Sequence, residues 1–354
     1  MNKLTVCVLF GGVSPEHEVS LRSAETVLSN LNTDLYHILP VGITRDGHWM
    51  LYGSNDYSAL PSGRWEQCPD NRPAVLSPAR GQGLLVEGED GWYAEPVGCV
   101  FPVLHGANGE DGAMQGLMQL AGIPCVGPGV AASAASMDKT MTKLVADKAG
   151  IRQAAWQLVT GTELHRNTEA VLDRLEQDPY PRFVKPAGTG SSVGVSKVHD
   201  REQLKAALEL AVSFDEKVLV EEAIIGQEVE VAVLGNDCPA ASVCGEIDSG
   251  VEFYDYDAKY VTDTAQCIIP ARISDESGEQ VRDMAVKIYQ ALGCRGLSRV
   301  DFFVTPEGEP VFNEINTLPG FTSISMYPKL FEASGIPIDQ LLTKLIDYAI
   351  DDRK

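Results

Sequence analysis

The sequence predicts an α/β fold divided into more than one domain, and three observations support this prediction. At 354 residues the chain is longer than one hydrophobic core usually organises, so two or three domains are expected. Its apolar content of 44% and charged content of 22% are ordinary for a globular protein. Segments with strand character alternate with helical segments along much of the chain, which is typical of α/β architecture.

The N-terminal region begins with an apolar run that predicts a buried strand, and Gly11-Gly12 turns the chain after it. Ser14 and Pro15 form a helix-start signal, with Ser as the N-cap and Pro in the first position. A strand, a helix and a strand in this order favour a parallel arrangement. The predicted elements here are a strand at 4–10, a helix to about residue 31, strands at 36–43 and 99–104, and a helix at 113–121.

Two boundaries divide the chain into predicted domains of residues 1–130, 131–220 and 221–354. The first follows Gly127-Pro128-Gly129, where small residues predict a flexible connection, and the second lies around a predicted strand at 218–222. The other predicted elements are helices at 137–149, 202–213 and 277–292, strands at 182–186, 298–303 and 311–316, and a closing helix after Ile338.

The net charge of −22 argues against nucleic acid or an anionic membrane as the main partner, although it allows a local basic pocket for phosphates. The eight cysteines are scattered and include no CxxC pair, so they indicate neither a zinc site nor a disulfide framework. The N-terminal apolar run is too short for a signal peptide, and no run of about 18 apolar residues occurs. We therefore expect a cytoplasmic protein.

A polar cluster is predicted on one face of a hairpin near the C-terminus. If residues 307–308 form a two-residue turn, Asp301 pairs with Glu314. The same register pairs Arg299 with Asn316, and cross-strand partners share a face with alternate residues of each strand. Two carboxylates and an amide oxygen suit a Mg²⁺ ion held against phosphate oxygens, with a cation beside them. The alternative is a solvated polar face, and a one-residue slip in register would scatter the cluster.

A loop at 188–194, rich in glycine and serine, offers backbone N–H groups that can surround phosphate oxygens, and Lys185 precedes it. A simple glycine-rich hairpin is the alternative. The sequence contains neither a Walker A pattern nor a GxGxxG fingerprint, which argues against a P-loop NTPase and a standard dinucleotide site. Lys139 lies in the first turn of a predicted helix, where a cation opposes the helix dipole. It therefore indicates an anionic ligand nearby, or else a pairing with Asp138 or solvent.

Three further segments carry candidate site residues. Glu16 lies at a predicted helix N-terminus, where its carboxylate either caps the helix or binds a substrate ammonium. His105 directly follows a strand, a position where α/β domains bind ligands, and a structural loop is the alternative. Residues 253–260 contain three tyrosines and a lysine, which predict either a lid that excludes water or an edge strand with aromatic pairs.

Taken together, these residues resemble the D-alanine–D-alanine ligase family of the ATP-grasp superfamily. The resemblance extends from residue 4 to residue 328 in family order, and its first and last segments are the most specific. The matching segments are Gly11 to Ser20, His105 to Gly112, Met137 to Lys139, Val184 to Pro186 with Gly190 to Gly194, Phe253 to Tyr260, and Ser298 to Asp301 with Asn313 to Pro328.

This resemblance implies an ATP-grasp fold of three α/β domains, with ATP held between the central and C-terminal ones. It implies that ATP drives the ligation of two D-alanines to D-alanyl-D-alanine for peptidoglycan synthesis, with release of ADP and phosphate. The first D-alanine would become an acyl phosphate, because a carboxylate cannot expel oxide, and a lid would protect that electrophile from water. Family members are typically homodimers that use Mg²⁺ or Mn²⁺, often helped by K⁺.

The resemblance also assigns roles around the amino acids. Glu16 would bind the ammonium of the first D-alanine, and Ser191 and Tyr260 would complete a hydrogen-bond network with it. Arg299 and the Gly320 N–H would stabilise the oxyanion that forms when the second D-alanine attacks. The other residues beside the amino acids would be His105, Tyr254, Ser325 and Met326.

Roles for ATP and the metal follow in the same way. Lys139 and Lys185 would hold the ATP phosphates, and Lys259 would neutralise the phosphoryl group during transfer. The adenine and ribose site would be formed by Glu221, Ile224, Glu228 and Phe253. The metal ligands would be Asp301, Glu314 and Asn316, in agreement with the hairpin pairing.

Two alternatives to this function remain. Related D-alanine–D-serine ligases tend to carry Phe in place of Tyr254 and Arg in place of Met326, and a methionine suits a methyl group better than a hydroxyl. Both positions therefore favour D-alanine as the second substrate. The other alternative is a nucleotide-binding regulatory protein with a decayed ligase site, against which the complete set of expected lysines and metal ligands argues.

Overall fold

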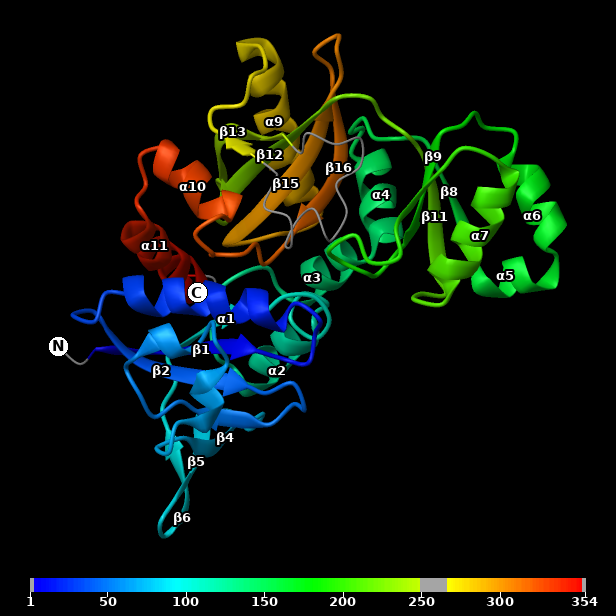
Figure 1. Cartoon of the computed structure of the whole chain (residues 1–354). Coiled ribbons are helices and arrows are strands. Elements are labelled where there is room, and N and C mark those ends of the chain that lie inside the picture. The colour runs from blue at the N-terminus through cyan, green and yellow to red at the C-terminus, as the bar shows by residue number, and fades with distance from the viewer. Residues whose placement is uncertain (1–2, 249–265, 352–354) are drawn as a thin grey trace.

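Strand β1 (Leu4–Gly11) lies between two parallel neighbours, β2 (Tyr36–Ile43) and β7 (Cys99–Val103), as the opening pattern predicts. The computed structural model describes residues 3–248 and 266–351 (Figure 1). Within these ranges the strands form three sheets, of seven, four and five strands. Helices accompany each sheet, which confirms the predicted α/β class.

The first sheet belongs to the N-terminal region and has the order β6-β5-β4-β3-β2-β1-β7. Beyond β2 its strands pair antiparallel, so the sheet is mixed. The further elements of this region are β3 (Trp49–Leu51), β4 (Arg72–Leu76), β5 (Leu84–Gly88), β6 (Gly91–Glu95), the short 3-10 helices η1 (Tyr57–Ala59) and η2 (Arg64–Gln67), and helices α1 (His17–Asn30) and α2 (Ala113–Ala121).

Helix α1 begins at His17, later than the sequence predicts. The prediction of Ser14 as its N-cap was wrong, because Ser14 Oγ accepts a hydrogen bond from the Glu16 N–H at 3.2 Å and Glu16 occupies the N-cap position. The Glu16 side chain makes no capping hydrogen bond. Its carboxylate is directed instead to the cavity described below.

The second and third sheets are antiparallel, with the orders β10-β9-β11-β8 and β14-β13-β12-β15-β16. The second sheet region comprises β8 (Trp156–Thr160), β9 (Arg182–Pro186), β10 (Ser196–Val198), β11 (Lys217–Glu222), α5 (Gly161–Arg166), α6 (Thr168–Leu175) and α7 (Arg201–Val212). The third comprises β12 (Gln227–Leu234), β13 (Ala240–Asp248), β14 (Gln266–Ile268), β15 (Leu297–Val304), β16 (Pro310–Asn316), α9 (Asp275–Ala291), α10 (Met326–Ala333) and α11 (Ile338–Asp351).

The small residues after Gly129 form helix α3 (Val130–Met137), so the prediction of a flexible connection was wrong there. Four of these eight residues are alanine, the strongest helix former, which outweighs the small size of the side chains. Asp138 caps the next helix, α4 (Lys139–Lys148). Both helices contribute to the apolar core of the third sheet. The domain bounds drawn from the sequence stay a prediction.

One apolar core joins the two ends of the chain. It contains Phe10 of β1 and Leu28 of α1 together with Phe331 of α10 and Leu345 of α11. Figure 1 accordingly shows the dark-red C-terminal helix α11 beside the blue helix α1. Within the described ranges, none of the helices combines the length and the apolar composition that a bilayer crossing requires.

Candidate active site

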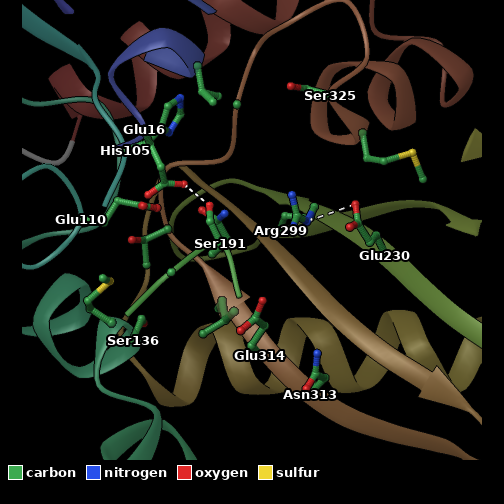
Figure 2. Close-up of a pocket in the computed structure, with 18 of the residues that line it drawn as sticks. Glu16, His105, Glu110, Ser136, Ser191, Glu230, Arg299, Asn313, Glu314 and Ser325 are labelled. Carbon is green, nitrogen blue, oxygen red and sulfur yellow. Dashed lines mark hydrogen bonds and ion pairs between the residues drawn. The ribbon is translucent and has the colours of Figure 1, made fainter. Parts of the chain in front are cut away.

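Two adjoining cavities lie where the three sheets come together. The first cavity has a volume of about 380 Å³, and its walls include Glu16 and Arg299 (Figure 2). The second cavity has a volume of about 750 Å³ and lies between the second and third sheets. Lys139, Ser191 and Glu314 line both cavities, so ligands bound in the two can meet at these residues.

The Glu16 carboxylate is held at the junction by a short hydrogen bond. Its Oε1 accepts from Ser191 Oγ at 2.5 Å, as the dashed line in Figure 2 marks. Ser191 has φ +49°, a left-handed conformation that is uncommon outside glycine and that often occurs at functional sites. Gly106, with φ +68°, lies so close that a Cβ there would be 2.6 Å from Glu16 Oε2. The backbone on both sides is therefore shaped around this carboxylate.

His105 lines the first cavity and uses both ring nitrogens to join separate segments. Its Nδ1 lies 3.0 Å from the Leu318 carbonyl oxygen, so this nitrogen carries the proton. Its Nε2 lies 3.4 Å from Ser23 Oγ, which accepts the Phe321 N–H at 3.0 Å. Burial lowers the pKa of His105, although Glu16 raises it, so the ring is neutral. His105 thus ties helix α1 to the loop after β16.

Glu110 is a half-buried group of the first cavity for which the sequence suggested no role. Its Oε2 accepts the Gly106 N–H at 2.7 Å and its Oε1 accepts the Leu318 N–H at 3.2 Å. Burial, followed by the nearby charge of Glu16, raises the pKa of Glu110 to about 8. The carboxyl is therefore largely protonated at neutral pH. Its position in the conspicuous segment 105–112 was the only available sequence signal.

Glu221 of the second cavity lies between two lysines. Its Oε2 is 2.8 Å from Lys185 Nζ and its Oε1 is 3.2 Å from Lys143 Nζ. Burial raises the pKa of Glu221, but the two lysines outweigh it and hold the pKa at about 2. Lys143, which is almost fully buried, was not predicted as a site residue from the sequence. The spacing of Lys143 from Lys139 was the signal, because residues four apart share a helix face.

Lys139 lines both cavities and is hydrogen-bonded to the glycine-rich loop and to the residue just before that loop. Its Nζ donates to the Thr189 carbonyl at 2.5 Å, and its backbone N–H donates to the Ala187 carbonyl at 3.0 Å. Asp138 forms an ion pair with Lys217. These contacts hold the Lys139 ammonium where the two cavities meet. Two other predicted residues, Ile224 and Glu228, line the second cavity.

The hairpin of β15 and β16 has the predicted pairing at its polar end: Asp301 lies opposite Glu314, and Arg299 opposite Asn316. The predicted two-residue turn was wrong, because residues 306–308 form a three-residue loop that shifts the nearby pairs by one. A β-bulge at Asn313 reverses this shift. Asn313 and Glu314 line both cavities.

Arg299 is fixed by two carboxylates. Its Nε and Nη2 each donate to Asp301 at 2.8 Å, and its Nε lies 3.1 Å from Glu230 Oε2 (Figure 2). Asp301 lines neither of the two cavities. It is buried, and its carboxylate contacts Arg299. Glu230 was missed, although the alternation along β12 places it on the face of Glu228. Its pairing opposite Asp301 depends on the order of strands in the sheet.

The polar end of the hairpin has the donors that a hard divalent cation requires. Asn316 Oδ1 is buried and has no hydrogen-bond partner among the described residues, an arrangement that a bound cation would resolve. The described ranges contain no group of three or more His, Cys, Asp or Glu side chains that could hold a metal. A cation held here would therefore need the Asn316 amide together with Asp301, Glu314 and oxygens of a ligand.

The remaining predicted residues divide into two groups. Gly320, Ser325 and Met326 line the first cavity, and a Cβ at Gly320 would lie 2.8 Å from Ser325 Oγ. Ser325 Oγ accepts the Thr322 N–H at 3.0 Å. The other group lies outside the described residues and consists of Phe253, Tyr254, Lys259 and Tyr260.

This geometry suits phosphoryl transfer between two bound molecules. The second cavity presents lysines and an ionised carboxylate, which can bind a nucleotide, and the first presents a carboxylate able to bind an ammonium. Glu314, one of the predicted metal ligands, lies at their junction, where charge would develop during transfer.

Comparisons with known proteins agree with this arrangement. The family model of the D-ala D-ala ligase N-terminus matches residues 5–128, and that of the D-ala D-ala ligase C-terminus matches residues 145–347. A D-alanine–D-alanine ligase from Acetivibrio thermocellus is 50% identical, over 99% of this chain and 96% of the relative. D-alanine–D-alanine ligase B from Clostridium tetani is 47% identical, over 100% of this chain and 95% of the relative.

Solved structures resemble the whole chain as well. The VanG D-Ala:D-Ser ligase from Enterococcus faecalis has a TM-score of 0.89 and 42% identity, covering 98% of this chain and 100% of that structure. The D-alanine–D-alanine ligase from Coxiella burnetii has a TM-score of 0.86 and 35% identity, covering 100% of this chain and 95% of that structure.

Proposed function

This chain belongs to the D-alanine–D-alanine ligase family, and from this membership we propose that it joins two D-alanines with ATP, through D-alanyl phosphate, for peptidoglycan synthesis. The observation that carries the proposal is the junction of the two cavities at Lys139, Ser191 and Glu314. There the γ-phosphate of ATP in the second cavity would meet the carboxylate of an amino acid in the first. The products would be D-alanyl-D-alanine, ADP and phosphate.

Glu16 would bind the ammonium of the first D-alanine. A carboxylate is the natural partner of an ammonium, and the bond from Ser191 fixes the orientation of this one. The neutral His105 ring adds no competing positive charge on this wall. Tyr260 is proposed as a further member of this network, by family resemblance alone.

Lys139 and Lys185 would bind the ATP phosphates, since their ammonium groups lie at and beside the cavity junction. Glu221 stays ionised and can accept a hydrogen bond from the adenine amino group. Ile224 and Glu228 would complete the adenine and ribose site. Phe253 and Lys259 are carried over from the family for stacking the base and neutralising the phosphoryl group.

The proposed divalent cation is Mg²⁺ or Mn²⁺, held by Asp301, Glu314 and Asn316. The orphaned Asn316 oxygen and the two carboxylates suit such an ion. When bound, it would neutralise the phosphate charge that develops during transfer. Activation by K⁺ is proposed on family resemblance only.

The second half-reaction would use the opposite wall of the first cavity. The amine of the second D-alanine attacks the acyl carbon, and the electrons move onto the carbonyl oxygen before phosphate leaves. Arg299, kept protonated by Asp301 and Glu230, and the Gly320 N–H would stabilise this oxyanion. Ser325 would lie beside the second substrate.

The choice between D-alanine and D-serine depends on the second subsite. Met326 is buried on its wall and offers a thioether rather than a hydrogen-bond donor, which suits a methyl group. Tyr254, the other residue expected to matter, lies outside the described residues. The likeness to the VanG D-Ala:D-Ser ligase keeps D-serine as a second candidate substrate.

The test measures ADP release with Mg²⁺-ATP and D-alanine, and then resolves by mass the products formed from equimolar D-alanine and D-serine. Mainly D-alanyl-D-alanine would support the proposal, whereas mainly D-alanyl-D-serine would keep the mechanism and overturn the subsite assignment. Without D-alanine-dependent ADP release, a nucleotide-binding protein with a decayed site would be the better description.

We also propose that the enzyme is a cytoplasmic homodimer. All eight cysteines are free, which is compatible with a reducing compartment. The dimer is carried over from the family, and sedimentation at micromolar concentration tests it.

A further inference from the structure

Lys329 differs from the other cations on the wall of the first cavity. Lys139 donates to the Thr189 carbonyl, and Arg299 is bound by Asp301 and Glu230. Lys329 lines the same cavity but has no hydrogen bond or ion pair to any described residue. Within the described ranges, its ammonium is therefore the cation on this wall that no protein group already binds.

The position of Lys329 in its helix reinforces this point. It lies in the first turn of α10, where a positive charge is unfavourable because it opposes the helix dipole. Ser325, at the N-cap, makes no capping hydrogen bond to the helix. The positive end of the helix and the Lys329 ammonium therefore both act on the cavity, and an anion bound there would compensate both.

Neighbouring residues locate Lys329 beside the second subsite. Glu230, Cys267, Arg299 and Lys329 all line the first cavity. In agreement with this, burial and Glu230 raise the pKa of the Cys267 thiol, whereas Lys329 and Arg299 lower it. Lys329 does not line the second cavity, so its ligand belongs among the amino acids rather than the nucleotide phosphates.

An amino acid entering this part of the cavity needs such a cation. Four carboxyl groups line the first cavity, namely Glu16, Glu110, Glu230 and Glu314. The attacking D-alanine carries its own carboxylate, which the ionised carboxylates of this set repel, although the largely protonated Glu110 does not. Arg299 is already paired with Asp301 and Glu230. Its carboxylate must also point away from the acyl phosphate so that the amine can reach the carbonyl carbon.

We infer that Lys329 binds the carboxylate of the second amino acid and selects acceptors that carry a negative charge next to the attacking amine. This inference rests on the proposed ligase function and adds a positioning residue to its second subsite. Lys329 takes no part in ATP binding or in formation of the acyl phosphate.

The test lets D-alanine and D-alaninamide compete for the same acyl phosphate in the presence of Mg²⁺-ATP. D-alaninamide has no carboxylate, so it can act only as the acceptor. Both amines intercept one intermediate, so the ratio of D-alanyl-D-alanine to D-alanyl-D-alaninamide, measured by mass, reports on the second subsite alone. We expect Lys329→Met to lower this ratio by about tenfold, the effect of losing one hydrogen bond between charged groups.

Lys329→Arg should keep most of the preference, and the KM for ATP should stay unchanged in both variants. Lys344→Met, on the exposed face of α11, is the matched control and should leave the ratio unchanged. Lys329→Gln serves if the methionine variant fails to fold. An unchanged ratio in an active Lys329→Met or Lys329→Gln enzyme overturns the inference. If the parent makes neither product, the proposed function itself fails.

Discussion

Glu16 and Ser191, which are 175 residues apart in the chain, share a 2.5 Å hydrogen bond at the junction of the two cavities. The bond joins the loop after β1 to the glycine-rich loop after β9. It couples the group proposed to bind the first D-alanine to the loop proposed to lie against the ATP phosphates.

We expect Ser191→Ala to lower kcat/KM for D-alanine by about 10- to 100-fold, the usual effect of removing a hydrogen bond to a charged group. Because Ser191 has φ +49°, alanine there also strains the backbone, so Ser191→Gly is the control that removes the hydroxyl without strain. Rates of ADP release should fall similarly in both variants. Full activity of the glycine variant would show that the hydroxyl is dispensable.

Glu314→Gln should nearly abolish turnover, because an amide binds a divalent cation more weakly than a carboxylate does. Titration of activity with Mg²⁺ should show a raised requirement for the metal. Glu307→Gln, at the exposed turn of the same hairpin, is the control and should behave like the parent. Activity of Glu314→Gln within twofold of the parent would refute the metal assignment.

The Lys143–Glu221–Lys185 cluster predicts an order of stability among variants. Glu221→Gln leaves the buried Lys143 and the half-buried Lys185 without their carboxylate and should lower the free energy of unfolding by about 3–5 kcal/mol. Lys143→Met leaves the Glu221–Lys185 pair intact and should cost about 1–3 kcal/mol. Urea denaturation at pH 7 measures both. The reverse order would mean that Lys143, rather than Glu221, is the centre of the cluster.

Glu221 also predicts a loss of stability in acid. Its folded-state pKa of about 2 lies below the ordinary value of 4.5, so the folded state binds its proton less readily than the unfolded state. The stabilisation is fully present above about pH 5 and is lost as the pH falls from 4.5 towards 2. The difference in unfolding free energy between the parent and Glu221→Gln should shrink over this interval. A constant difference would contradict the depressed pKa.

Glu110 predicts the opposite trend at higher pH. Its folded-state pKa of about 8 lies above 4.5, so the folded protein keeps a proton that the unfolded chain releases. This contribution is present below about pH 4.5 and is lost as the pH rises towards 8, by about 1.4 kcal/mol per pH unit at its steepest. Glu110→Gln lacks this dependence. Its stability profile between pH 5 and 8 should be flatter than that of the parent, and parallel profiles would contradict the assignment.

The local elements were largely predictable from the sequence, because buried strands and amphipathic helices leave a periodic pattern. The ATP-grasp fold expected from the resemblance is confirmed by the likeness to solved ligases. In the hairpin, two shifts of strand register that the sequence pattern does not reveal offset each other. The loop is one residue longer than predicted, and the bulge at Asn313 compensates, so Asp301 still lies opposite Glu314.

The buried site groups could not be predicted from the sequence, since their positions depend on contacts between distant elements. Glu110 accepts a hydrogen bond from Leu318, which is more than 200 residues away in the sequence. Lys143 of helix α4 forms an ion pair with Glu221 of strand β11. A single sequence shows charged residues but not which of them lose their water. Burial therefore decides which acids and lysines belong to the site.

The shared core of β1, α1, α10 and α11 has a consequence for how the protein is made. Phe10 and Leu345 pack in one cluster, so the N-terminal region cannot complete its core until the last helix has left the ribosome. The core of the second sheet lies entirely between Val159 and Val220 and can form earlier. During synthesis, the middle of the chain can therefore complete its core before the beginning does.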